Sequence, residues 1–173
     1  MESQRGEHTH GQSIASSRSI TRRVMGTLDA NNYGNVHGGA IMRMVDEAAA
    51  IVAVRHAHHP VVTARVERFD FLKPAYIGDV VTVDCIMNYV GRTSMEVGVE
   101  VIAEDLMTGE IRKVASSQLI YVAIDEQGRP APVPPLVPAD AIEEARIERA
   151  RLRRMHAQQL GEQLAKAVHE EGK

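Results

Sequence analysis

Residues 29–57 of this chain read DANNYGNVHGGAIMRMVDEAAAIVAVRHA, and this stretch decides the fold. Its first part is crowded with Asn and Gly, which favour turns, and the pair Gly38-Gly39 closes this loop. From there on, alanine and methionine favour helix, and apolar residues cover nearly every face of the second half. The sequence therefore predicts one long, mostly buried helix over residues 38–57.

The residues that follow this helix change to a period of two, which is typical of strands. Within 79–90 and 94–104, the odd-numbered residues are apolar or aromatic from positions 81 and 95 onward. Segments 61–71 and 112–124 are also rich in β-forming residues. Because no second helical pattern separates these strands, the sheet is predicted to be antiparallel. We therefore expect an α+β fold in which a curved antiparallel sheet wraps around one long central helix.

The two ends of the chain differ in composition from the body, residues 18–129. Residues 1–17 are rich in Ser, Gln, His and Gly, which predicts a disordered leader. Five of the seven prolines fall in 130–138, which predicts an extended spacer. Residues 139–173 begin with a capping pattern and contain few helix breakers, so they are predicted to form a C-terminal helical extension.

The overall composition, with 44% hydrophobic and 25% charged residues, is typical of a globular protein of one domain. A formal net charge of −3 and the scarcity of aromatic residues argue against a dedicated binder of nucleic acid or anionic membranes. The single Cys85 excludes an intramolecular disulfide, and no Cys/His cluster indicates a metal site. No apolar run has the length of a signal peptide or a membrane span, so we expect a cytoplasmic protein.

Two carboxylates, Asp46 and Glu47, interrupt the apolar helix, where an ionised group is costly unless it is paired. Arg43 lies three and four residues before them and can pair with one. Either both acids lie on a solvated stripe, or one points into a cleft as a base or nucleophile. The N–H groups of Gly38 and Gly39 at the helix N-terminus are able to approach an oxyanion, although such loops also serve turn geometry alone.

Several of these stretches together match a known family. The pattern of residues 29–48 continues through 64–71, 77–79 and 91–94, and it resembles the hotdog-fold acyl-CoA thioesterases. The resemblance is closest to the brain-type acyl-CoA hydrolases and their bacterial single-domain relatives, and it covers roughly residues 20–137. It implies a helix wrapped by an antiparallel sheet, in agreement with the pattern above.

The resemblance also implies catalytic roles for matching residues. Asp46 would activate water, or attack the thioester carbonyl directly, and Asn31, fifteen positions earlier, would orient the water or the substrate. Backbone N–H groups at Gly38 and Gly39 would polarise the carbonyl oxygen. In this family the two catalytic residues come from opposite subunits, which implies two composite sites in each dimer.

Coenzyme A carries phosphates, and the resemblance places a basic residue at Arg92 to meet them, with Thr93 and Ser94 as hydroxyl donors. The alternative is that Arg92 is simply a surface residue of a hairpin turn. The expected partners are the acyl-CoA substrate and further copies of this chain, because an isolated sheet of this type leaves its edges open. We expect a homodimer at least, and by resemblance a trimer of dimers, with no metal or redox cofactor.

Two other functions remain open at this point. The first is a hotdog hydratase or dehydratase acting on acyl thioesters, in which His37 would share the acid–base work. The second is a non-catalytic acyl-CoA-binding regulator that uses the arginine-rich helix over 139–170 to contact a partner or nucleic acid. The first predicts that His37→Ala is fatal and Asn31→Ala mild, and the second predicts binding without turnover.

Overall fold

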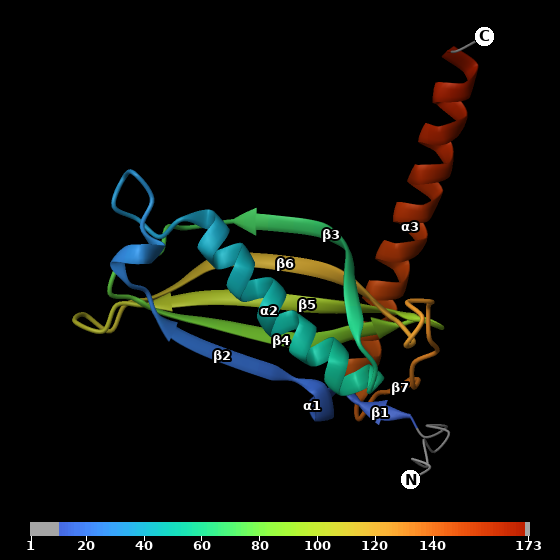
Figure 1. The fold of residues 1–173 in the computed structure, drawn as a ribbon, viewed down its shortest axis with the longest axis horizontal. Coiled ribbons are helices and arrows are strands. Elements are labelled where there is room, and N and C mark those ends of the chain that lie inside the picture. The colour runs from blue at the N-terminus through green and yellow to red at the C-terminus, as the bar shows by residue number, and fades with distance from the viewer. Residues whose placement is uncertain (1–10, 172–173) are drawn as a thin grey trace. The chain divides into compact units, whose positions relative to one another are not determined.

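A computed structural model describes the backbone of residues 11–171 and the side chains of residues 11–163. The chain divides into two compact units, Met1–Val137 and Pro138–Lys173. The first unit holds the sheet and the central helix (Figure 1), and the second holds the C-terminal helix α3 (Ala141–Glu171). No helix among the described residues is long and apolar enough to cross a membrane.

The central helix α2 spans Gly38–Ala57, which confirms the helix predicted for 38–57. His37 caps its N-terminus, because its Nδ1 atom accepts the N–H of Gly39 at 2.8 Å. At the other end His58 adopts a left-handed conformation (φ 52°), and its N–H donates to the Val54 carbonyl, as in an αL helix cap.

One expectation about α2 was wrong in part. The helix lies across one face of the sheet (Figure 1), but it is not covered on its outer side. Met42, Ile51 and Val54 are 42%, 40% and 44% exposed, which leaves an apolar stripe open. The apolar pattern of the sequence therefore predicts that a larger part of α2 is buried than the structure of a single chain shows.

The main sheet has five antiparallel strands in the order β2-β4-β5-β6-β3, which confirms the predicted antiparallel sheet. Its strands are β2 (Ser19–Val24), β3 (Val61–Phe71), β4 (Val80–Val90), β5 (Ser94–Glu104) and β6 (Ile111–Ala123). Strand β3 pairs with β6, not with β4, its neighbour along the chain, so β2 and β3 form the two edges. Strand β2 was not predicted.

The core lies between α2 and the face of the sheet that the alternating residues form. The odd-numbered residues of β4 from Val81 to Met87 and of β5 from Met95 to Ala103 are buried, as predicted. Glu96 departs from the expected alternation, because it is only 2% exposed and accepts the Asn88 amide at 3.1 Å. A Cβ atom on Gly98 would lie 2.5 Å from that amide nitrogen, so glycine makes room for it.

The predicted leader is wrong over its last residues. Residues 1–10 lie outside the described part, but β1 (Gln12–Ser13) pairs in parallel with β7 (Leu136–Val137), within the expected spacer. The helix α1 (Ile14–Ser17) follows, and Ile14 is 1% exposed. One buried isoleucine and one strand pairing are enough to order a segment that is otherwise polar.

A short 3₁₀ helix, η1 (Thr27–Asp29), leads into the loop that precedes α2. In the second unit, the Asp140 carboxylate caps α3 by accepting the N–H groups of Ile142 and Glu143, each at 2.9 Å. The Glu143 carboxylate accepts the N–H of Ala139 at 2.7 Å, so the predicted cap closes one residue earlier than a standard capping box.

Candidate active site

The two carboxylates in the middle of α2 have different partners. Arg43 Nε donates to Glu47 Oε1 at 2.8 Å, and both side chains are largely exposed. The arginine therefore neutralises Glu47, and Asp46 is left to other partners. Asp46 is exposed, so its carboxylate is accessible from outside the chain.

Asp46 is held by two hydroxyl groups from the sheet. Thr63 Oγ1 donates to Asp46 Oδ1 at 2.8 Å, and the Tyr121 hydroxyl donates to the same oxygen at 3.0 Å. The Tyr121 hydroxyl also lies 3.0 Å from the Asp46 backbone carbonyl. Asp46 Oδ2 has no hydrogen-bond partner within the described residues. One carboxylate oxygen is thus fixed, and the other is available for chemistry.

Thr63 and Tyr121 reach the same oxygen because they are directly paired across β3 and β6. A register shift follows Thr63 at once, between Thr63 and Arg65. Neither residue was singled out from the sequence, where each is one β-forming residue among many. Only the helical position of Asp46 was readable there.

Tyr121 is 1% exposed, and its ring belongs to the core. Burial raises the pKa of the Tyr121 phenol, and the negative charge of Asp46 raises it further. The phenol therefore stays protonated and acts as a hydrogen-bond donor at neutral pH.

Asn31 lies in the loop before α2 and is tied into its own turn. Its Oδ1 atom accepts the N–H of Tyr33 at 2.8 Å and that of Asn35 at 3.2 Å. The Nδ2 amide has no partner among the residues that the structure describes, so it remains a free donor. No hydrogen bond in the described part of the chain joins Asn31 to Asp46.

The two glycines at the start of α2 are not equivalent. The Gly39 N–H is taken by His37 Nδ1, whereas the Gly38 N–H has no acceptor within residues 11–171. Of the two predicted oxyanion donors, Gly38 alone is free in one protomer. The same bond bears on His37, because an Nδ1 atom that accepts an N–H carries no proton. Its Nε2 atom then holds the proton, so His37 has no free lone pair for a general base.

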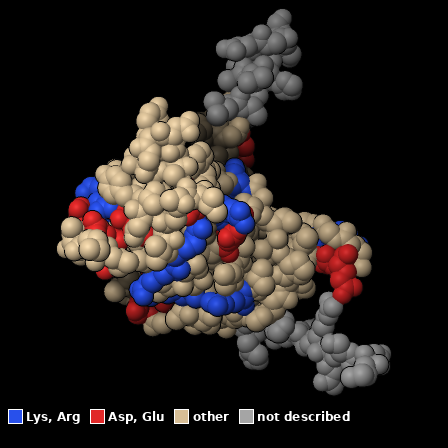
Figure 2. Space-filling model, turned by 60° about the vertical axis from the view of Figure 1, so that its left-hand side comes forward, with Lys and Arg blue, Asp and Glu red and all other residues tan. Residues whose placement is uncertain are grey.

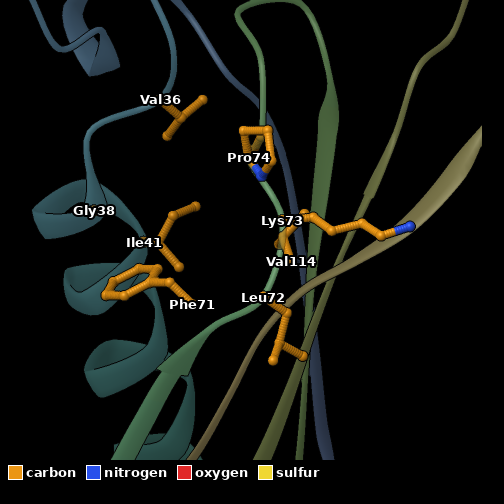
Figure 3. A pocket seen from close by; sticks show the side chains of 9 residues that line it. Val36, Gly38, Ile41, Phe71, Leu72, Lys73, Pro74 and Val114 are labelled. Atoms are coloured by element: carbon orange, nitrogen blue, oxygen red, sulfur yellow. The ribbon is translucent and has the colours of Figure 1, made fainter.

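A cavity of about 410 Å³ is lined in part by Gly38. Figure 3 shows Ile41 and the Phe71 ring beside α2, with Leu72 and Pro74 on the opposite side. The lining is mostly apolar, and the Lys73 side chain extends away from α2 (Figure 3). A cavity of this volume and polarity is suited to a small apolar group.

The residues expected to meet coenzyme A lie in the turn between β4 and β5. The Arg92 side chain is exposed, and the carbonyls of Arg92 and Thr93 accept the N–H groups of Val133 and Ala123 at 3.0 Å each. These backbone hydrogen bonds fix the turn, but they do not involve the Arg92 guanidinium. Charged side chains of both signs occupy the face of the molecule in Figure 2.

This turn and the start of α2 lie at opposite ends of the sheet. Ser94 pairs with Val122, next to the start of β3, whereas Gly38 packs against Phe71, at the end of β3. Strand β3 has 11 residues, which corresponds to about 33 Å. One protomer therefore does not bring Arg92 to Gly38.

Metal coordination was not expected from the sequence. In the part of the chain that is described, no group of three or more His, Cys, Asp and Glu side chains is placed to hold a metal ion.

Comparison with known proteins gives consistent matches. A sequence profile described as "Thioesterase superfamily" matches residues 33–110. The acyl-CoA thioester hydrolase YkhA of Bacillus subtilis, described as uncharacterised, is 46% identical over 118 residues, which cover 68% of each chain. The cytosolic acyl coenzyme A thioester hydrolase of Homo sapiens is 40% identical over 126 residues, which cover 68% of this chain. They cover 33% of the human protein, so this chain spans about a third of its length.

Solved structures agree with these matches. An apo-hexameric acyl-CoA thioesterase superposes with a TM-score of 0.84 at 36% identity, covering 88% of this chain and 97% of the other. An acyl-CoA hydrolase from Staphylococcus aureus, in complex with butyryl coenzyme A, coenzyme A and coenzyme A disulfide, has a TM-score of 0.72 at 35% identity. That match covers 89% of this chain and 98% of the other. The same hydrolase was solved as variants in which an asparagine, an aspartate or a threonine is replaced by alanine.

Proposed function

The chain belongs to the hotdog-fold acyl-CoA thioesterases, and we propose that it hydrolyses fatty acyl-CoA to the free acid and coenzyme A with Asp46 as base or nucleophile. The observation that carries the assignment of Asp46 is the asymmetry of its carboxylate. Two hydroxyl donors hold Oδ1, and Oδ2 is without a partner in the described part of the chain. A further support is the spacing of the replaced residues in the S. aureus hydrolase, 15 and 17 positions apart, as Asn31, Asp46 and Thr63 are here.

The reaction needs few groups. Asp46 Oδ2 takes a proton from water while the water oxygen attacks the thioester carbonyl carbon, or Oδ2 attacks that carbon itself. The C–S bond then breaks and the coenzyme A sulfur leaves as a thiolate, which takes up a proton. In the second route water hydrolyses the resulting anhydride. The free Asn31 Nδ2 amide donates to the water or substrate, and the Gly38 N–H donates to the carbonyl oxygen.

One protomer does not bring these groups together. Gly38 and Asp46 are eight residues apart on α2, a separation of about 12 Å along the helix axis. The N–H and the attacking oxygen must both reach one carbonyl group, with the attacking atom about 3–3.5 Å from the carbon. We therefore place Asn31 and Gly38 of one subunit beside Asp46 of its partner.

The open surfaces of the protomer fit such a dimer. Strand β3 is an edge of the sheet, and Val62 and Val66 on it are 45% and 42% exposed. Antiparallel pairing of two β3 strands would reverse the second protomer, and so bring its Arg92 turn to the end of the sheet where Gly38 lies. Arg92, Thr93 and Ser94 of the partner would then meet the phosphates of coenzyme A. The hexamers among the similar structures support a trimer of such dimers.

Thiol release from acyl-CoAs of short to long chain tests this function. We expect the wild type to turn over at least one of them, and Asp46→Asn to lose about 10²-fold or more in kcat. Glu47→Gln is the matched control, because it changes the neighbouring carboxylate in the same way and should stay within about threefold of wild type. An Asp46→Asn protein that is folded and fully active would refute the assignment.

Mixing two inactive variants tests the composite site. Asp46→Asn and Asn31→Ala, co-refolded in equal amounts, should form mixed dimers with one intact site each. About a quarter of the wild-type activity is expected from random pairing, since half the dimers are mixed and each has one of two sites. If exchange is verified by mass spectrometry of the intact assembly and no activity returns, both residues act within one subunit.

A further inference from the structure

We propose that Tyr121 is a positioning residue for the Asp46 carboxylate, and that its hydroxyl holds one carboxylate oxygen so that the other faces the reacting carbonyl. This inference rests on the proposed role of Asp46 as base or nucleophile. It adds a residue from β6 to a site otherwise assigned to α2, its preceding loop and β3.

The first argument is the geometry of the hydroxyl. Its oxygen lies 3.0 Å from both Asp46 Oδ1 and the Asp46 backbone carbonyl, so one buried phenol contacts the side chain and main chain of the same residue. These two contacts fix the Asp46 side chain relative to the helix. With Oδ1 directed at the sheet, Oδ2 is directed away from it. If the carboxylate rotated freely, Asp46 Oδ2 would not stay aligned with the water or the thioester carbonyl.

The second argument is the difference between the two donors. Thr63 lies on the edge strand β3 and is exposed in the single chain. Tyr121 is 1% exposed, and its ring is packed in the core on β6. Of the two donors, Tyr121 is therefore the one whose position is fixed within a single protomer.

The third argument concerns the state of the donor. Burial and the charge of Asp46 raise the pKa of Tyr121, so the phenol stays protonated at neutral pH. The Tyr121 hydroxyl is therefore present as a donor to Asp46 Oδ1 throughout the working range of the enzyme.

No cation forms an ion pair with Asp46 among the described residues, so the two hydroxyls alone hold its carboxylate. Arg43 and Glu47 on α2 pair with each other, and Arg65 pairs with Glu67 on β3. On β4 the Cys85 thiol lies near Tyr121, and burial raises its pKa to about 12, so it carries no charge at neutral pH. Strands β4 and β5 direct their acidic side chains to the opposite face of the sheet, since apolar residues alternate with them toward α2.

Separate measurement of kcat and KM for Tyr121→Phe tests the inference. The change removes one oxygen, and we expect kcat to fall by about 3–10-fold with KM within about twofold. A loss confined to kcat indicates a misaligned carboxylate and not weaker substrate binding. Tyr76→Phe is the matched control, because the Tyr76 ring lies under the Arg112 guanidinium and makes no hydrogen bond to Asp46 among the described residues, so neither constant should change.

A double variant separates positioning from general damage. In an Asp46→Asn background, Tyr121→Phe should cause no further loss of the residual rate, because the hydroxyl acts through Asp46. A second replacement, Tyr121→3-fluorotyrosine, keeps the hydroxyl donor and should retain a kcat within about twofold of wild type. Circular dichroism and thermal unfolding verify the fold of each variant.

The outcomes separate the role of Tyr121 from the role of Asp46. A Tyr121→Phe enzyme with the wild-type kcat, or one whose loss lies in KM alone, overturns the inference. An equal loss in the wild-type and Asp46→Asn backgrounds also overturns it, since Tyr121 would then act elsewhere. Full activity of Asp46→Asn alone is a different result, because it refutes the proposed function of Asp46 itself.

Discussion

Cys85, the single cysteine of the chain, lies at the centre of the core on β4. Burial raises the pKa of its thiol to about 12, so only about one molecule in 10⁴ would be thiolate at pH 8. We expect the native protein to resist a disulfide reagent for hours, and the protein unfolded in urea to release one equivalent per chain. Rapid labelling of the native protein would contradict the burial of this side chain. If labelling is slow, Cys85 also adds no background to a thiol-release assay.

Asn31 holds its own turn together, and two variants separate this structural role from its proposed chemical role. Asn31→Asp keeps the oxygen that accepts from Tyr33 and Asn35, but it removes the amide donor and adds a negative charge. We expect an unchanged melting temperature and a loss of about 10²-fold in kcat. Asn31→Ala should lose both the turn and the activity. We expect its free energy of unfolding to fall by about 1 kcal/mol, which lowers the melting temperature by a few degrees. An active Asn31→Asp enzyme would show that the residue serves the loop alone.

Single residues could be predicted from the sequence where a reactive residue type stands out from the local pattern around it. Asp46 stands out because a carboxylate in an apolar helix is unusual, whereas Asn31 was identified only through the resemblance to the thioesterase family. Tyr121 and Thr63 do not stand out. Their contact with Asp46 depends on the register of β3 against β6, two strands far apart in the sequence. Register is a property of the assembled sheet, so these residues were not predictable from one sequence.

Among the elements, the C-terminal end of α2 is joined to the proline-rich spacer by a buried histidine. His56 Nε2 donates to the Pro134 carbonyl at 2.9 Å, and its Nδ1 atom has no partner among the described residues. Burial lowers the pKa of His56 below its ordinary value of 6.5, although the Pro134 contact opposes this. The folded state therefore holds the neutral form.

The pH dependence of stability follows from this shift. An unfolded His56 binds a proton at about pH 6.5, whereas the folded one binds it only at lower pH. The contribution of His56 is thus complete above that pH and is lost as the pH falls below it, by at most about 1.4 kcal/mol per pH unit. His56→Gln keeps a donor for Pro134 and removes the titration. Urea unfolding between about pH 7.5 and 5 should give a flatter curve for the variant. Parallel curves would contradict the assigned cause.

The elements differ in how well the sequence predicts them. The apolar run of α2 predicted both ends of the helix, because the Gly38-Gly39 pair marks its start and a change of period follows its end. Strand β2 was missed because its large apolar residues, Ile20 and Val24, are 50% and 58% exposed and form no core pattern. It is a strand because it pairs with β4 over six residues, and such pairing is not visible within its own sequence.

For the whole molecule, the exposed edge of β3 is the surface at which we expect a second protomer to bind. Val66→Lys places a charge in the middle of this edge, where β3 strands of two protomers are proposed to meet. We expect size-exclusion chromatography with light scattering to show a shift from the assembly toward monomers, with loss of activity. Met107→Lys, at a residue that is 93% exposed in the turn between β5 and β6, is the control and should change neither. An intact, active Val66→Lys oligomer would place the interface elsewhere.

The parallel pairing of β1 with β7 has a consequence for the connectivity of the first unit. Gly11 lies against the Val137 side chain, so the start and the end of the strand pattern are neighbours in space. A linker of about five residues would join them, and a new terminus could be opened in the exposed turn at Thr108. Such a circular permutant would keep the strand pairings and the helix. For this unit, the order in which the strands are synthesised is then separable from the order in which they lie in the sheet.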